Sequence, residues 1–211
     1  MPKVFEKKEK DFTIGIWQST ETFAGLSDLC DLNKADLEKW GLFQSEKRKR
    51  EWLTVRALLS DLFAAKPVPQ ISYNDFGKPI LSNGMGISIS HTKEFIAILI
   101  TSKNFAGIDL ECLRERISVL ASKFVSDEEA KSIPEINQTE YLHVLWGAKE
   151  VLFKIHSQKE LDFRSQLFVS PFQYQSEGII SASINKDNFS KAYRINYQLW
   201  QGMMLAYSIA D

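Results

Sequence analysis

The stretch from Tyr141 to Ile155 constrains the fold of this chain more than any other segment. If each residue is turned by about 100°, as in an α-helix, apolar side chains cover most of the circumference. They are Leu142, Val144, Leu145, Trp146, Ala148, Val151, Leu152, Phe153 and Ile155. A helix that is apolar on nearly all sides is stable only when the rest of the fold encloses it. The sequence therefore predicts a long, largely buried helix.

One narrow stripe of this helix is polar and consists of His143, Gly147, Glu150 and Lys154. A glycine costs about 1 kcal/mol relative to alanine inside a helix, so Gly147 indicates that another group approaches closely there. Lys149 lies off the stripe, and we expect its side chain to run along apolar surface with the ammonium group in water. His143 is open to two interpretations, a hydrogen-bonded core histidine or a functional group.

A second motif, Gly107 to Glu111, follows the apolar run Phe95 to Ile100. On a strand, positions i and i+2 share a face, so Asp109 and Glu111 point to the same place. Glu150 and Lys154 are four apart and share one face of the helix. Three carboxylates and a lysine that converge suit a hard, oxygen-ligated cation that holds phosphate oxygens. The alternative is a buried Glu150–Lys154 pair without a ligand.

Composition narrows the classes of protein to consider. The chain has 211 residues, enough for one large domain or two small halves, and 44% of them are hydrophobic. The net charge of −1 gives no general attraction to nucleic acid or membranes. Cys30 and Cys112 lack metal or redox spacing, which favours free thiols in a reduced compartment. The N-terminus is charged and no long apolar run is present, so we expect a cytoplasmic protein.

The order of predicted elements indicates an α+β fold, with helices packed on antiparallel sheets. Helices are expected within 27–42, 45–63, 117–125 and 126–132, in addition to the helix at Tyr141. Strands are expected at 12–18, 71–73, 87–90, 95–110, 163–170, 179–184, 192–198 and 203–209. Ser45 is the expected N-cap of the second helix.

Several basic and hydroxyl side chains are candidates for binding phosphate. Arg56 falls on the apolar face of the 45–63 helix, where a buried guanidinium needs either a carboxylate or a phosphate as partner. Arg48 lies near the same face, and Lys78 occupies a turn between Gly77 and Pro79. Near the end of a short strand, Ser88, Ser90 and Thr92 share one face and His91 lies on the other.

Together these segments resemble the 4′-phosphopantetheinyl transferases, in particular the larger class typified by the surfactin-synthetase activator. The resemblance rests on Gly77-Lys78-Pro79, Ser90-His91-Thr92, Gly107 to Glu111, and Trp146 to Lys154. The segment Ala121 to Glu129 is also similar to the family's Phe-Phe-Ser-x-x-Glu pattern. Thr92 replaces a serine and Val151 an alanine or serine, and neither change removes a charge or a ligand.

The resemblance implies that the 4′-phosphopantetheine arm of coenzyme A is transferred to a serine of an acyl or peptidyl carrier protein. It implies that Asp109, Glu111 and Glu150 hold Mg²⁺, while Lys154 contacts a phosphate and Glu150 helps to deprotonate the serine. Arg48, Arg56, Lys78, Ser90 and His91 would bind coenzyme A. It also implies a pseudo-twofold fold of two similar halves, near 1–105 and 106–211, with the active site in the cleft and a monomer in solution.

Two other functions remain open at this point. A Mg²⁺-dependent phosphohydrolase or nuclease would use the same three carboxylates, although the near-zero net charge argues against nucleic acid. A module that binds coenzyme A without turnover would not need Glu150 and Lys154. For a carrier partner, Phe124 and Val125 are candidate apolar contacts with Lys123 as their basic neighbour, and a core role for Phe124 is the alternative.

Overall fold

The computed structural model describes residues 3–63, 65–156 and 161–210, and it has the predicted α+β architecture with antiparallel sheets. A four-stranded sheet has the order β1-β2-β6-β5 and a five-stranded sheet the order β7-β11-β10-β9-β8. A small hairpin, β3 (Ile71–Tyr73) and β4 (Pro79–Leu81), lies beside the first sheet. All neighbouring strands pair antiparallel.

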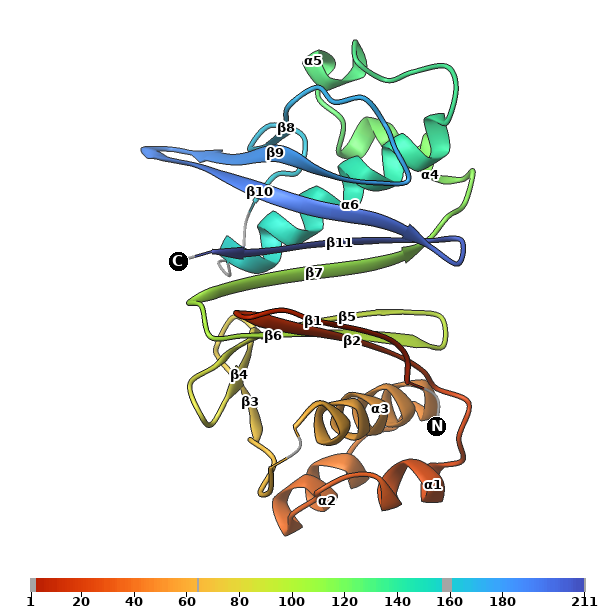
Figure 1. The fold of residues 1–211 in the computed structure, drawn as a ribbon, viewed down its shortest axis with the longest axis vertical. Coiled ribbons are helices and arrows are strands. Elements are labelled where there is room, and N and C mark those ends of the chain that lie inside the picture. Colours follow the sequence, from red (N-terminus) through yellow and green to blue (C-terminus); the bar gives the residue numbers. More distant parts are fainter. Residues whose placement is uncertain (1–2, 64, 157–160, 211) are drawn as a thin grey trace.

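The first sheet is built from the N-terminal part of the chain. Its strands are β1 (Lys3–Lys8), β2 (Phe12–Gln18), β5 (Gly86–Thr92) and β6 (Phe95–Thr101). Helix α3 (Glu46–Leu62) packs on its outer face, and the Ser45 side chain caps α3 by accepting a hydrogen bond from the Arg48 amide. Helices α1 (Phe23–Asp28) and α2 (Lys34–Gly41) lie beyond α3 (Figure 1).

The second sheet is built from the C-terminal part of the chain. Its strands are β7 (Phe105–Cys112), β8 (Leu167–Val169), β9 (Glu177–Lys186), β10 (Phe189–Trp200) and β11 (Met203–Ala210). Helix α6 (Gln138–His156) covers the face turned away from the first sheet. Short turns of helix, α4 (Ile117–Leu120), η1 (Ala121–Lys123) and α5 (Asp127–Ala130), lie between β7 and α6 in the sequence.

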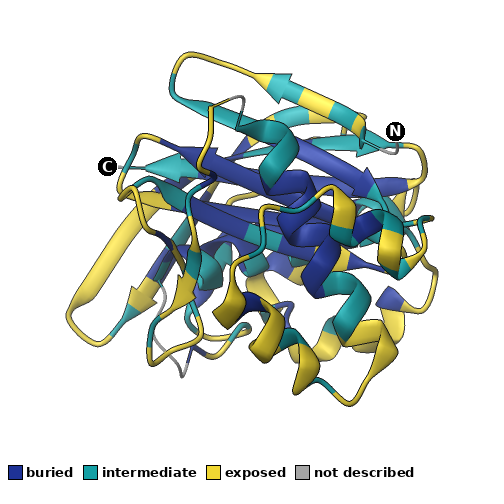
Figure 2. Cartoon of the chain, turned by 90° about the horizontal axis from the view of Figure 1, so that it is seen from below, coloured by how far each residue is buried: buried dark blue, intermediate teal, exposed yellow. Residues whose placement is uncertain are grey.

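The two sheets lie between the helices, so the chain forms four layers with three apolar clusters (Figure 1). The middle cluster joins the sheets through residues such as Ile16, Leu99, Ile108 and Leu205. Figure 2 shows that burial is concentrated in the central strands and the helices packed on them. Helix α6 is buried along most of its length, as its apolar circumference predicts. No described helix is long and apolar enough to cross a membrane.

Some predicted elements differ from those in the structure. The strand expected at 95–110 is two strands, β6 and β7, because Ser102 to Asn104 turn the chain. The helical region within 27–42 contains α2 and only the end of α1, and the strand expected at 163–170 is reduced to β8. Strand β1 was not predicted, because most of its residues are charged and it lies at a sheet edge with no fully buried residue.

Candidate active site

Asp109 lies at the centre of the candidate site. It belongs to β7, opposite Ala206 of β11, and is only 3% exposed. Its Oδ1 atom accepts hydrogen bonds from Lys154 Nζ at 2.8 Å and from Ser90 Oγ at 3.1 Å. Its Oδ2 atom is buried and has no hydrogen-bond partner among the described residues. A buried carboxylate oxygen without a donor is an available acceptor for a cation or a proton donor.

Glu111 and Glu150 are half-buried carboxylates beside Asp109. Burial is the main cause that raises the pKa of each to about 7, and repulsion from Asp109 adds to it. Lys154 opposes both shifts, and for Glu111 a hydrogen bond from Trp146 does so too. Two elements far apart in sequence thus bring together the three carboxylates that the motifs predict, and the charge of Asp109 disfavours ionisation of the two glutamates.

Lys154 supplies the positive charge of this cluster. Its ammonium group forms an ion pair with Asp109 at 2.8 Å and donates to the Ile108 carbonyl oxygen at 2.8 Å. The close approach of α6 to the sheet makes these contacts possible. A Cβ at Gly147 would lie 3.0 Å from Ala206 Cβ, and one at Gly107 would lie 2.5 Å from the Val151 carbonyl oxygen. Gly147 therefore has the packing role that its place in the polar stripe indicated.

The serine hydroxyls of β5 connect the two sheets. Ser88 Oγ accepts a hydrogen bond from the Ile108 amide and Ser90 Oγ accepts one from the Leu110 amide, each at 3.1 Å. Both serines are buried, while His91 on the opposite face is exposed, as the alternation predicts. Ser90 thus uses its hydroxyl to link β7 and to orient Asp109.

Two neighbouring cavities bring the candidate phosphate-binding residues together. One, of about 210 Å³, is lined by Lys78 and Lys154 and so reaches the carboxylate cluster. The other, of about 200 Å³, is lined by Arg48, Arg56 and His91. Gly77, Pro79 and Ile89 line both, so the two cavities are adjacent. Burial lowers the pKa of Lys78.

The second cavity also contains a carboxylate that the sequence reasoning did not consider as a site residue. Glu51 lines it, with ion-pair distances of 3.6 Å to His91 and 3.8 Å to Arg48. Its Oε1 atom is buried and has no hydrogen-bond partner among the described residues. Its spacing from Arg48 could have indicated this, because residues three apart in a helix are neighbours on its surface.

Arg56 has a carboxylate partner, which was one of its two predicted alternatives. Its Nε and NH2 atoms both lie 3.2 Å from Asp36 Oδ1, and its guanidinium group lies over the Trp52 ring. Burial lowers the pKa of Arg56, and Asp36 opposes that shift. The same side chain lines the cavity with Arg48 and His91, so a phosphate contact stays a prediction.

A third cavity, of about 310 Å³, adjoins Glu111 of the carboxylate cluster. Glu111, Phe124, His143 and Trp146 are among its lining residues. His143 is buried, its Nδ1 atom lies 2.8 Å from the Thr139 carbonyl oxygen, and burial lowers its pKa. This hydrogen bond fits the interpretation of His143 as a core histidine.

Lys149 and Val125 are placed differently from the sequence prediction, whereas Phe124 has the core role that was one of its two predicted alternatives. Lys149 does not reach water: it is 0% exposed and its ammonium group is bonded inside the protein. Phe124 and Val125 belong to the core, so they are not available as surface contacts for a partner. Of Lys123, Phe124 and Val125, only Lys123 is exposed. Helical periodicity does not reveal the burial of these side chains, because the residues that cover them come from other segments.

The atom types of the carboxylate cluster suit a divalent cation, but the side chains are not arranged around a metal position. Its donors are carboxylate oxygens, which Mg²⁺ prefers, and Asp109 has a buried oxygen without a partner. Within the described ranges, however, no group of three or more His, Cys, Asp or Glu side chains is arranged to hold a metal ion. Lys154 here neutralises the charge of Asp109.

Comparison with curated proteins gives relatives of one kind. The chain is 31% identical over 114 residues to the 4′-phosphopantetheinyl transferase AcpT of Escherichia coli K12. It is also 31% identical over 114 residues to the protein of that name from Salmonella typhi. Over about half of its length, the chain is similar to 4′-phosphopantetheinyl transferases. This confirms the resemblance to these transferases, while membership of the larger class stays a prediction.

The extent of the match to these transferases is limited. The aligned segment is 51% of this chain, 57% of the Escherichia coli protein and 58% of the Salmonella typhi protein. The chain thus matches somewhat more than half the length of these curated relatives. No protein-family model matches the chain.

Proposed function

We propose that this protein transfers the 4′-phosphopantetheine arm of coenzyme A to a serine of an apo acyl or peptidyl carrier protein. The observation that carries this proposal is the cluster of Asp109, Glu111, Glu150 and Lys154, which adjoins a cavity lined by basic side chains. Similarity to transferases of this name supports it. The enzyme would be a holo-carrier-protein synthase of the larger class.

The proposed reaction is a phosphoryl-group transfer. The serine Oγ atom forms a bond to the β-phosphorus of coenzyme A, and the bond from that phosphorus to the bridging oxygen breaks. Adenosine 3′,5′-bisphosphate then leaves with the electron pair of the broken bond. The serine proton passes to Glu150, directly or through water, because a carboxylate with a pKa of about 7 is a useful base near neutral pH. Lys154 neutralises charge on a phosphate oxygen.

Asp109, Glu111 and Glu150 would hold Mg²⁺ on the diphosphate in this proposal. When bound, the cation would neutralise the charge of the diphosphate oxygens. Ser90 orients Asp109 through its hydroxyl group, and the Leu110 amide in turn fixes Ser90. The chain thereby holds one carboxylate in place before any ligand is present.

We also propose that the basic cavities bind the nucleotide portion of coenzyme A. Arg48, Arg56 and His91 would bind phosphate in one cavity, and Lys78 would do so in the cavity that Lys154 shares. In this proposal the two halves, 1–105 and 106–211, are related by a pseudo-twofold axis, and the site occupies the cleft between them. The outer helix on each sheet, α3 or α6, supports this relation.

The carrier protein would dock beside the third cavity. There, α4 presents Val119 and Leu120, which are 74% and 40% exposed, and Arg114 and Arg116 precede it as exposed residues. Glu111 and both arginines line the cavity, so a carrier helix at this place would bring its serine toward the carboxylates. Carriers implied by the family are acidic, which suits a basic rim. We propose that the enzyme is a cytoplasmic monomer.

The test is incubation of the protein with coenzyme A, Mg²⁺ and an apo carrier protein, followed by intact mass of the carrier. A carrier with the added phosphopantetheine mass supports the proposal, and Asp109→Asn should abolish the addition. Binding of coenzyme A without transfer would instead indicate a binding module. Hydrolysis of phosphate esters without dependence on coenzyme A would indicate a phosphohydrolase.

A further inference from the structure

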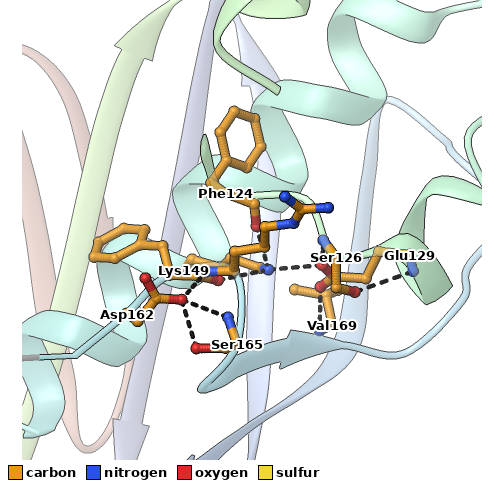
Figure 3. A network of polar contacts seen from close by, with 9 residues as sticks. Phe124, Ser126, Glu129, Lys149, Asp162, Ser165 and Val169 are labelled. Atoms are coloured by element: carbon orange, nitrogen blue, oxygen red, sulfur yellow. Dashed lines mark hydrogen bonds and ion pairs between the residues drawn. The ribbon is translucent and has the colours of Figure 1, made fainter. Parts of the chain in front are cut away.

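Lys149 is a buried cation that the proposed chemistry does not use. It lies off the polar stripe of α6, directly before Glu150, and its side chain is 0% exposed. Its ammonium group donates to the Phe124 carbonyl oxygen at 2.6 Å, to Glu129 Oε2 at 2.7 Å and to the Phe163 carbonyl oxygen at 2.9 Å (Figure 3). An ammonium group has three hydrogens, so these contacts use its full donor capacity.

Glu129 extends this network to two further segments. Its Oε2 atom accepts from the Ser126 amide at 2.8 Å, and its Oε1 atom accepts from the Val169 amide of β8 at 2.9 Å. The pair therefore joins α6 to the turn before α5 and to the edge of the second sheet. Every acceptor and donor of the pair has a partner, which is the condition under which a buried ion pair is tolerated.

The two carbonyl groups that Lys149 holds belong to the residues that enclose Trp146. The ring of Phe124 meets the indole edge-on with centroids 5.2 Å apart, and the ring of Phe163 lies 5.4 Å away. Trp146 lies three residues before Lys149, on the same helix. Trp146, Phe124 and Glu111 line the same cavity, so the indole lies beside a carboxylate of the cluster.

This arrangement links the cation to the site by three steps. Lys149 fixes two backbone carbonyls, the attached rings fix the indole, and the indole shares a cavity with Glu111 of the cluster. A purely structural role would need only apolar packing, because replacing buried ion pairs by apolar side chains is often neutral or stabilising. The position of the two carbonyls indicates a more specific role.

We propose that the Lys149–Glu129 pair is a positioning device that holds Trp146, and through it Glu111, in the geometry the reaction needs. Lys149 and Glu129 are positioning residues and touch no substrate in this proposal. The expected effect of this pair on kcat rests on the proposed function. The orientation of Trp146 is a consequence that does not depend on any activity.

The kinetic test compares Lys149→Met/Glu129→Gln, Trp146→Phe and the variant that combines all three changes. The paired change removes both buried charges, so neither ion is left without its partner. We expect the paired variant to fold and to lose about ten- to a hundredfold in kcat, with KM for coenzyme A within about twofold. We expect the combined variant to be no slower than Trp146→Phe, because both changes act through one contact. Losses that multiply would overturn the proposal.

The second test needs neither metal nor substrate. The indole N–H signal of Trp146 in a ¹⁵N-labelled protein is assigned by its absence in Trp146→Phe. We expect this signal to shift or broaden in Lys149→Met/Glu129→Gln. Arg164→Ala is the matched control, because Arg164 pairs with Asp127 at the surface near the same network, and it should leave signal and kcat unchanged. An unchanged indole signal in the folded paired variant would overturn the proposal.

Failure of the paired variant to fold and failure of the proposed function can be distinguished from failure of the positioning proposal. If the paired variant does not fold, Glu129→Gln alone keeps Lys149 and weakens the anchor, and it should move the indole signal in the same way. An unmoved signal in that variant would contradict the proposal. If the wild-type protein transfers no arm, the proposed function fails, whereas a shifted indole signal would still support the positioning of Trp146.

Discussion

Helices α3 and α6 each cover the outer face of one sheet, and each contains a buried cation paired with a carboxylate. Arg56 of α3 pairs with Asp36 and also lines a cavity, so it remains accessible to a ligand. Lys149 of α6 pairs with Glu129 and has no exposed surface. A buried ion pair between a cation and a carboxylate can thus belong either to a binding site or to the protein interior. The two roles differ in whether the cation lines a cavity.

The charges of the residues around α3 and α6 also differ. The cavity beside α3 is lined by three basic residues, Arg48, Arg56 and His91, with Glu51 among them. The polar stripe of α6 instead faces the acidic residues of β7, Asp109 and Glu111. In the proposed function, nucleotide binding therefore belongs to residues 1–105 and chemistry to residues 106–211.

The largest effect is expected from Asp109→Asn, which keeps the size of the side chain and removes its charge. Transfer should fall about a hundredfold or more, the range for loss of a major electrostatic stabiliser. Circular dichroism and the melting temperature check that the fold survives. Glu115→Gln, which removes an exposed charge close to β7, is the control and should be active. Near-normal turnover of Asp109→Asn would place the chemistry elsewhere.

Arg56→Met tests whether the cation of α3 acts on the ligand. Coenzyme A binding should weaken by about 1.5–3 kcal/mol, the range for a hydrogen bond to a charged group. The melting temperature should also fall, because Asp36 loses its buried partner. Calorimetric titration measures the first effect. A lower melting temperature with unchanged affinity for coenzyme A would show that Arg56, like Lys149, acts only inside the protein.

Glu150→Gln tests the acidic side of the comparison through its pH dependence. The pKa of Glu150 is raised from 4.5 to about 7, so the folded protein retains a proton that the unfolded chain releases. Stability from this group therefore falls as pH rises from 4.5 through 7. The variant should melt at a higher temperature than the wild type at pH 8, and this advantage should shrink toward pH 5. The same advantage at both values would contradict the shifted pKa.

Addition of Mg²⁺ gives a related and smaller effect. A cation held by Asp109, Glu111 and Glu150 relieves the repulsion between them, and it stabilises the folded state by binding it. The melting temperature of the wild type should therefore rise with Mg²⁺ at pH 8 and change less in Glu150→Gln. Equal shifts in both proteins would show that the ion binds elsewhere.

Glu51→Gln should act in the opposite direction to Arg56→Met. Glu51 lies among the cations of the first-half cavity and repels an anionic ligand, so removing its charge should tighten coenzyme A binding. The gain should be about fivefold, near 1 kcal/mol, as for a charge close to solvent. Weaker binding would show that Glu51 orients Arg48 or His91 for the ligand.

The smallest effect is expected at the carrier surface. Arg116→Glu should raise KM for the carrier a few-fold at low salt, and the effect should fade as salt screens the charge. Lys123→Glu is the matched change on the neighbouring η1 segment, and it tests the earlier placement of this surface. KM for coenzyme A should not move in either variant. An unchanged carrier KM for both would place docking elsewhere.

The sequence alone determined the features that depend on local periodicity. Strand β2 begins and ends where its pattern predicts, and Asp109 and Glu111 share a face because strand residues alternate. The apolar circumference of α6 required burial, and its polar stripe marked Gly147, Glu150 and Lys154. Motif spacing indicated a resemblance to the 4′-phosphopantetheinyl transferases, and the similarity to curated proteins of that name over about half of the chain confirms this resemblance.

The tertiary structure decided which groups meet. Lys149 became an internal anchor because Glu129 and the carbonyls of Phe124 and Phe163 arrive from other segments. Ser90 became a partner of Asp109 because the edge of one sheet lies against the edge of the other. Periodicity specifies the face on which a side chain lies, but the groups that cover that face come from residues far along the chain. Long-range packing therefore supplied the partners, and with them the roles of these side chains.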